Sequence, residues 1–303
     1  MAESITKKEE LTEEQLRQYF FDGCLLLSDF LSPEELQQLR SYSDELEDYV
    51  MSPGFSNPLS ILPFQPSRHM EKTDSQDRVL CRIENFVPHH KGLSALSETI
   101  GRVVGQIFHH AYAESADDPV QPACLFKEKI NFKRPGGKGY APHYDGPSPA
   151  VFGLATEFIT AQLAIDEQTP ENGCILGVFP RNLCPEDREL TQIAAKAGGD
   201  PDLDGRAGAL QPDVVEKLPW RFIPAPAGSL FLFNHYFPHY SEGNKTDKVR
   251  RTAYMLYNSA EEGDFHEEHA RLMADARAKF SVSPNQPVDW LKDANAIAAA
   301  LDG

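Results

Sequence analysis

The sequence predicts a mainly β fold with helices packed around it, and two patterns carry that prediction. From Cys124 onward, short apolar segments are separated by glycine and proline turns, which is typical of a sandwich or barrel rather than of alternating β-α-β units. Before that point the chain shows helix-capping patterns and a long amphipathic segment. A chain of 303 residues with 41% hydrophobic residues can bury a core of the required size.

Two helix starts flank a short strand near the N-terminus. Thr12 with Gln15 forms one capping-box pattern, and Ser32 with Glu35 forms another. The apolar run Cys24–Leu27 between them predicts a strand.

A third helix is indicated further along by apolar residues at helical spacing, namely Leu93, Leu96, Ile100, Val103, Val104 and Ile107. The segment Ser52–Gln76 before it is rich in proline and serine, and we expect a loop there.

Five strands are predicted in the second half of the chain. They are Leu125–Phe132, Glu157–Ile165, Gly173–Val178, Ser229–His235 and Arg250–Asn258. An acidic excursion, Glu186–Gln211, separates the third from the fourth and is expected to carry a surface helix. The tail after Glu261 is helix-like through Lys279.

Charge and cysteine usage exclude several classes of partner. A formal net charge of −17 argues against nucleic acid or an anionic membrane surface as a partner, because both require a cationic face.

The five scattered cysteines show neither a disulfide framework nor zinc-knuckle spacing. The charged N-terminus lacks the apolar core of a signal peptide, and no later run is long enough to span a bilayer. We therefore expect a cytoplasmic protein with a small-molecule substrate; the sequence is silent on oligomeric state.

The segment His143-Tyr144-Asp145 places two metal-binding side chains at positions i and i+2. In extended backbone such residues project to the same side, so both can contact one ion. Alone the pattern is weak evidence, because His-x-Asp occurs by chance in many sequences. Joined by a second imidazole from elsewhere in the chain, it would form the facial triad of non-haem iron(II) oxygenases.

His239 is the candidate for that second imidazole. It follows the apolar run 231–238 and precedes the turn 241–244. Arg250 then opens a strand, and a guanidinium there can bind a carboxylate through two hydrogen bonds. His235 is the rival to His239; it lies too early relative to the turn and to Arg250 for the spacing of the family that the chain resembles.

The chain resembles the phytanoyl-CoA dioxygenase-like family of iron(II)- and 2-oxoglutarate-dependent oxygenases. The resemblance covers most of the chain, through Phe21-Asp22-Gly23, Ser32-Pro33-Glu34-Glu35-Leu36, INFKRPGG, HYD and HYSEGNKTDKVRR. It implies a double-stranded β-helix, the jelly roll of cupin-like proteins, in a single domain of residues 1–303. The expected parts are an N-terminal helical portion at about 1–123, a jelly-roll core at about 124–260 and a C-terminal helical tail at 261–303.

The resemblance also implies the roles of individual residues. His143, Asp145 and His239 would be the iron ligands and catalytic residues, and Arg250 would pair with the C5 carboxylate of 2-oxoglutarate. Arg251 is adjacent but faces the other way. The implied cofactors are Fe(II), 2-oxoglutarate as co-substrate and O2, with ascorbate as a stimulant.

Three positions depart from the family pattern. Tyr144 stands where glutamine is common, Tyr240 stands where glycine is common, and Pro180-Arg181-Asn182-Leu183 replaces a PGSH-like turn. The first two positions do not ligate metal, and the third leaves the edge of the pocket undefined.

Strand parity adds candidates for co-substrate contacts. One face of the segment CLFKEKINFK carries Lys127, Lys129, Asn131 and Lys133. Related family members place the matching asparagine near the co-substrate, so Asn131 ranks first and Lys129 second. Thr160 and Gln162 share a face of the next strand and are further candidates. Lys127 and Lys133 fit a solvated sheet face equally well.

The implied reaction hydroxylates an unactivated C–H bond and releases succinate and CO2. The family acts on acyl-CoA thioesters, small osmolytes, aminoalkylphosphonates and natural products, and we expect a small polar or natural-product substrate. Two other classes stay open, a jelly-roll hydrolase or isomerase and an inactive binding module. Arg250 and the intact ligand set favour the oxygenase, and Asp145 argues against a halogenase, in which a small residue replaces the carboxylate.

Overall fold

The computed structural model describes residues 10–55, 67–72, 78–115, 117–145, 153–179, 210 and 212–279. Its helices are α1 (Glu13–Asp22), α2 (Pro33–Met51), α3 (Lys91–Tyr112), α6 (Pro212–Val215), α7 (His266–Lys279) and the 3-10 helix η1 (Val87–His89). Both capping boxes form as expected: the Thr12 and Ser32 hydroxyls each accept a hydrogen bond from the third residue of their helix.

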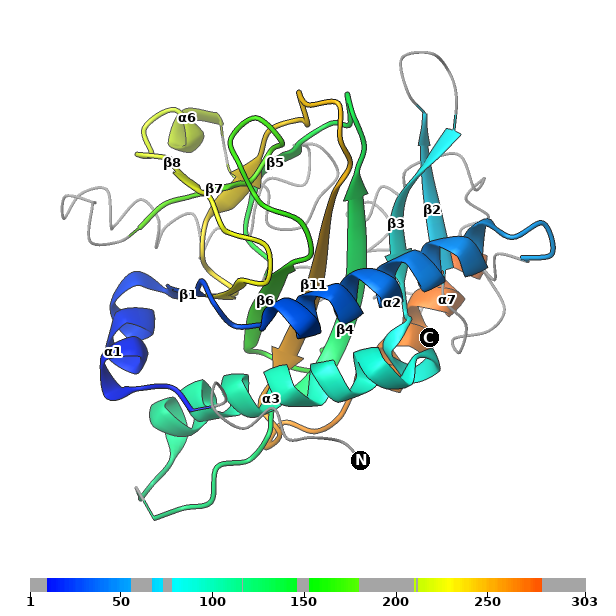
Figure 1. The fold of residues 1–303 in the computed structure, drawn as a ribbon. Helices are drawn as coiled ribbons and strands as arrows, with labels where there is room; N and C mark the ends of the chain where they lie inside the picture. Colours follow the sequence, from blue (N-terminus) through cyan, green and yellow to red (C-terminus); the bar gives the residue numbers. More distant parts are fainter. Residues whose placement is uncertain are drawn as a thin grey trace.

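Two antiparallel sheets form the centre of the molecule (Figure 1). The larger has the strand order β1 (Cys24–Leu27), β9 (Leu230–Asn234), β6 (Phe158–Ala164), β11 (Arg250–Asn258), β4 (Cys124–Lys133), β3 (Arg78–Glu84) and β2 (Ser67–Lys72). The smaller has the order β5 (Tyr140–His143), β10 (His239–Ser241), β7 (Ile175–Gly177) and β8 (Arg221–Ile223). Strands distant in sequence are neighbours in both sheets, which confirms the mainly β, jelly-roll class with packed helices.

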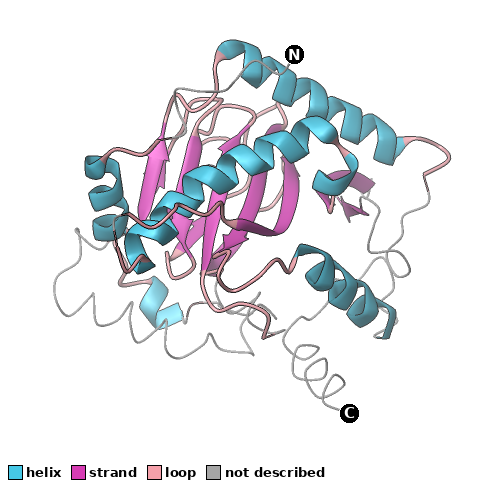
Figure 2. Ribbon diagram, turned by 90° about the horizontal axis from the view of Figure 1, so that it is seen from below, coloured by secondary structure: helices cyan, strands magenta, loops and turns pink. Residues whose placement is uncertain are grey.

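The two faces of the large sheet are chemically different because side chains alternate along each strand. The outer face is apolar and packs under the long helices α2 and α3, which cross it in Figure 2. This core includes Leu39, Leu46, Leu93, Ile100, Ile130, Leu163 and Met255. Burying each such side chain contributes roughly 1.5–3 kcal/mol. The inner face carries the polar residues between them, and these line the interior of the jelly roll.

The segment expected to be a loop, Ser52–Gln76, is corrected in part by the structure. Residues 67–72 form strand β2, which pairs antiparallel with β3 at the edge of the large sheet. These residues, SRHMEK, show no apolar alternation, so the partner strand rather than local sequence determines their conformation. Strand β1 confirms the strand predicted at Cys24–Leu27, whereas β2 and β3 are strands that the expected helical portion 1–123 did not include.

Other expectations concern residues outside the described ranges. The excursion Glu186–Gln211, apart from Leu210, and the turn Pro180-Arg181-Asn182-Leu183 lie there, as does the tail beyond Lys279. The short strands β5, β8 and β10 were not predicted, since three or four residues are too few to show a period.

Candidate active site

His143 and His239 lie directly opposite each other on the paired strands β5 and β10. Their ring centroids are 4.3 Å apart. His143 Nδ1 lies 2.7 Å from Ala141 O, and His239 Nδ1 lies 3.0 Å from Phe237 O. A proton on each Nδ1 satisfies these carbonyls, and that tautomer leaves each Nε2 with a lone pair for a metal.

Asp145 completes the group from the segment that leaves β5. Its Oδ1 lies 3.7 Å from His143 Nε2. One ligand atom from each of His143, Asp145 and His239 lies within 4.8 Å of the other two. Two imidazoles and one carboxylate on one side of an ion are the donor set of the non-haem iron facial triad. The residues present therefore fit an iron(II) ion.

The electrostatics of the group favour its metal-binding protonation state. Burial, and then the neighbouring His239, lower the pKa of His143 to about 3. Burial opposes ionisation of Asp145, but His239, His143 and Lys129 outweigh it and hold its pKa well below the ordinary value. At neutral pH His143 is thus neutral and Asp145 ionised, which are the forms that bind metal.

Thr160 lies beside Asp145 and contacts it directly. Its Oγ1 donates a hydrogen bond of 2.7 Å to Asp145 Oδ2, and the residue is fully buried on β6. In this position the hydroxyl orients the carboxylate. Strand parity had suggested that Thr160 contacts the co-substrate instead.

Arg250 is buried at the start of β11, with 3% of its surface exposed. Nη1 donates to Thr252 Oγ1 at 2.6 Å, Nη2 donates to the Gly173 carbonyl at 2.6 Å, and Nε has no partner. No carboxylate in the described part of the chain pairs with this guanidinium. An unpaired buried charge is costly, so an anionic ligand is expected here.

Lys133 lies opposite Arg250 in the sheet register, and the sequence left it open between a co-substrate contact and a solvated sheet face. Its Nζ donates to the Gly173 carbonyl at 3.1 Å, to Ser241 Oγ at 2.8 Å and to the Glu242 carbonyl at 2.6 Å. The side chain is 6% exposed, so the solvated reading of Lys133 is wrong. Since Ser241 follows His239 on β10, Lys133 joins the arginine end of the site to the histidine end.

Gly173 makes this arrangement possible. It has a φ of +75°, and a Cβ there would lie 2.4 Å from the Glu242 carbonyl oxygen and 2.9 Å from Lys133 Nζ. Only glycine gives the positive φ and the close approach at low cost. Its sequence signal is the Asn172-Gly173 pair, which is typical of a turn.

The remaining co-substrate candidates line the inner face. Asn131 and Gln162 are buried, and their side-chain oxygens have no hydrogen-bond partner. Lys129 is half-buried, with Nζ 5.2 Å from the centre of the Tyr254 ring, and burial lowers its pKa to about 8. The structure thus places Asn131, Gln162 and Lys129 toward the interior, where the charge of Lys129 acts on Asp145 and His143.

His235 is not part of the metal-binding group. It is buried, and its Nδ1 lies 3.1 Å from the Phe158 carbonyl oxygen. Within the described residues, the only cluster of histidine, cysteine and acidic side chains able to hold an ion is His143, Asp145 and His239.

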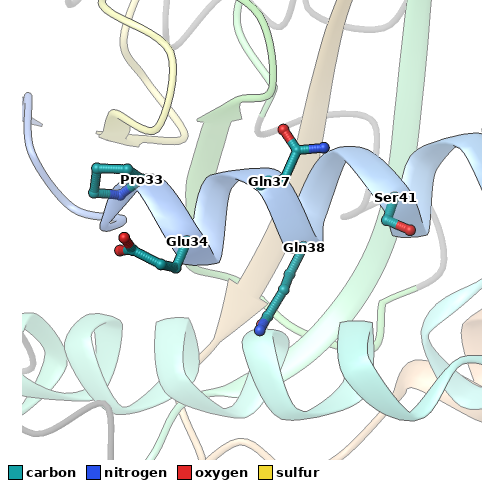
Figure 3. Close-up of a pocket in the computed structure, with 5 residues that line it drawn as sticks. All are labelled: Pro33, Glu34, Gln37, Gln38 and Ser41. Carbon is teal, nitrogen blue, oxygen red and sulfur yellow. The ribbon is translucent and has the colours of Figure 1, made fainter.

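A separate open pocket lies on the exposed side of α2, lined by Pro33, Glu34, Gln37, Gln38 and Ser41 (Figure 3). It has no histidine or cation and is formed by one helix, so we assign it no function. Among the described residues, no helix has the length and apolar character needed to cross a membrane.

Comparison with known proteins agrees with this geometry. The model of the family described as phytanoyl-CoA dioxygenase (PhyH) matches residues 19–252. A 2-aminoethylphosphonate dioxygenase from an uncultured bacterium, HF130_AEPn_1, is 33% identical over 89% of this chain and 88% of its own. A methylphosphonate hydroxylase from Gimesia maris is also 33% identical, with the same coverage of both chains.

Solved structures show the same fold at lower identity. EctD from S. alaskensis with 2-oxoglutarate and 5-hydroxyectoine has a TM-score of 0.59 at 16% identity, covering 86% of this chain and 80% of EctD. The non-haem α-ketoglutarate-dependent carbocyclase SnoK, from nogalamycin biosynthesis, has a TM-score of 0.58 at 19% identity, covering 85% of this chain and 88% of SnoK.

Proposed function

The chain belongs to the phytanoyl-CoA dioxygenase family, and on that premise we propose that it hydroxylates a C–H bond of a small organophosphonate at a centre built from His143, Asp145, His239 and Arg250. The enzyme is a 2-oxoglutarate-dependent non-haem iron dioxygenase. When bound, iron(II) and 2-oxoglutarate supply the oxidation, in which O2 is consumed, succinate and CO2 are released and the substrate gains a hydroxyl group.

The observation that carries the site assignment is the joint placement of the three ligand candidates and the unpaired buried arginine. Backbone carbonyls contact Nδ1 of His143 and of His239, which fixes each ring with its Nε2 available for a metal. Thr160 orients Asp145. Arg250 then binds the far carboxylate of 2-oxoglutarate, which removes its unpaired charge. A hydrolase or isomerase would not need that buried cation, and an inactive module would not need the full ligand set.

Asn131 and Gln162 are proposed as further co-substrate contacts. Their side-chain oxygens lack partners, and either amide can present its NH2 group instead after a flip. Asn131 lies opposite Thr252, which itself bonds Arg250, so its amide is near the arginine end of the site.

Aromatic side chains of the inner face keep water from the reacting atoms. Phe231, Phe233 and Phe237 form a buried cluster, and the Phe233 ring lies 4.9 Å from that of His239, measured between centroids. A dry site strengthens every charge interaction inside it and prevents side reactions.

The organophosphonate assignment is supported by the two relatives that share 33% identity over nearly their whole length, because both are named for phosphonate substrates. Loading the enzyme with iron(II), 2-oxoglutarate and ascorbate tests it directly. We expect 2-aminoethylphosphonate or methylphosphonate to stimulate succinate release and to give a hydroxylated product by phosphorus NMR. The His239→Ala variant is the control without turnover. Stimulation by non-phosphonate metabolites alone would overturn the substrate class.

A further inference from the structure

Cationic side chains gather on the inner face of β3 and β4. Arg82 and Glu84 of β3 lie opposite Asn131 and Lys129 of β4 in the sheet register. Arg82 Nε is 3.1 Å from Glu84 Oε1, so these two side chains form an ion pair. Lys127 shares the inward face of β4 with Lys129, since side chains two residues apart in a strand point the same way.

Both lysines lie on the strand face near the metal-binding carboxylate: Leu256 of β11 is opposite Lys127 of β4 and opposite Thr160 of β6, and Thr160 bonds Asp145. Burial lowers the pKa of Lys127 and of Lys129, and the charge of Asp145 is the largest influence that opposes this in each case. Each side chain nevertheless keeps part of its surface accessible. Lysines of a solvated sheet face would be open to bulk water. Lys127 and Lys129 are largely enclosed and lie near Asp145, so they line an internal site.

The charges in this region are not balanced by the protein. Arg82 is paired with Glu84, and iron(II) binding would engage Asp145. The side chains of Lys127 and Lys129 then share only the more distant charge of Glu84, which also pairs with Arg82. Burying two neighbouring positive charges is unfavourable, because both lose hydration and they repel each other, and a bound anion offsets this cost.

2-Oxoglutarate does not account for these charges. Its two ends are matched by the iron site and by Arg250 beside Lys133. Lys129 precedes Lys133 by four residues, which is about 13 Å along a strand. A second anion next to Asp145 would compensate the two lysines.

Resting on the proposed function, we propose that Lys127 and Lys129 bind the tetrahedral head group of the substrate and select a doubly charged oxyanion over a singly charged one. The aromatic face of Tyr254, below Lys129, and the phenylalanines of β9 leave the rest of the interior apolar. The head group lies at the lysines, and the carbon skeleton extends from it toward the iron.

Three compounds with the same aminoethyl skeleton test this charge selection: 2-aminoethylphosphonate, 2-aminoethanesulfonate and β-alanine. Their affinities are measured by calorimetry on anaerobic enzyme with iron(II) and 2-oxoglutarate, at a pH where the phosphonate is a dianion. We expect wild type to bind the phosphonate at least about tenfold more tightly than the other two. Lys127→Met and Lys129→Met should each remove at least about tenfold of phosphonate affinity.

Matched controls separate recognition from folding. Lys129→Arg keeps the charge and should retain the preference, and Lys91→Met alters an exposed lysine at the start of α3 and should change nothing. The 2-oxoglutarate affinity of every variant, read from its anaerobic absorbance, should stay within about threefold of wild type and so reports an intact site.

The possible failures are distinguishable. If wild type hydroxylates the phosphonate and both methionine variants bind it as tightly, the lysine subsite is wrong and the proposed function stands. If the methionine variants lose 2-oxoglutarate affinity in parallel, the lysines serve the co-substrate and the subsite is also wrong. If wild type binds 2-oxoglutarate but no phosphonate, the proposed substrate class fails, and the subsite fails with it.

Discussion

Thr160 Oγ1 donates a 2.7 Å hydrogen bond to Asp145 Oδ2, while Asp145 Oδ1 lies 3.7 Å from His143 Nε2. One oxygen of the carboxylate is thus held by the large sheet, and the other is presented to the ligand group. Thr160 is fully buried in a central strand, so its hydroxyl is a fixed reference for a residue that otherwise leaves β5 on a connecting segment.

Removing this hydroxyl should weaken iron binding without removing a ligand. Thr160→Val keeps the shape of the side chain but leaves Asp145 Oδ2 without its donor. We expect an affinity for iron(II) lower by about 10- to 100-fold, the usual effect of losing a partner of a metal ligand. Thr160→Ser restores the donor and should bind iron nearly as wild type. Titration of iron(II) under anaerobic conditions measures both, and equal affinity in the valine variant and wild type would contradict the role.

Arg250 and its neighbour Arg251 provide a matched pair for the co-substrate. Arg250→Met should weaken 2-oxoglutarate binding by on the order of 2–5 kcal/mol, since a buried carboxylate would lose its partner. Arg251 points outward, with its Nε 2.9 Å from Asp166 Oδ2, and Arg251→Met should leave 2-oxoglutarate affinity unchanged. Titration of 2-oxoglutarate into the two iron-loaded variants decides the matter. Loss in the Arg251 variant alone would reverse the assignment.

The contact of α7 with β4 predicts a pH-dependent stability. His266 Nε2 lies 2.7 Å from Glu128 Oε2, and Glu128 Oε1 accepts from the Val87 backbone at 2.8 Å. Burial opposes protonation of His266, but the hydrogen bond and charge of Glu128 outweigh it and raise its pKa. A histidine whose pKa is raised on folding stabilises the protein below its unfolded pKa of about 6.5, and that contribution is lost as pH rises through the folded pKa.

Denaturant unfolding at several pH values tests this contact. Wild type should exceed His266→Gln in free energy of unfolding by about 1–3 kcal/mol near pH 5.5, and the difference should shrink as the pH rises past neutrality. In a Glu128→Gln background, the effect of His266→Gln on the free energy of unfolding should no longer shrink as the pH rises, because the partner that raises the pKa of His266 is gone. A difference that grows with rising pH would show that the sign is wrong.

The sequence predicted the ligand candidates because their signals are local. An extended His-x-Asp places both side chains on one side of the backbone. The alternation of residues 250–258 gave the bounds of β11, and neighbouring residues of a strand face opposite ways, so Arg250 and Arg251 were assigned to opposite faces. His239 was a candidate from its place between an apolar run and a turn, and the family resemblance gave it the role of the distal ligand, because no short-range pattern joins it to His143.

Other features could not be read locally. Lys133 is buried by Gly173 and Ser241, which are remote in sequence, and a strand lysine otherwise resembles a solvated one. Thr160 bonds a ligand from a different sheet, so its face was predicted but its partner was not. Strand β2 forms within the expected loop because β3 pairs with it.

The most direct test of the iron centre is the absorbance of the anaerobic complex with iron(II) and 2-oxoglutarate. The account predicts a metal-to-ligand charge-transfer band in wild type and in His235→Ala, and its loss in His143→Ala, Asp145→Ala and His239→Ala, each with reduced iron content. A band that survives in His239→Ala and disappears in His235→Ala would contradict the assigned centre.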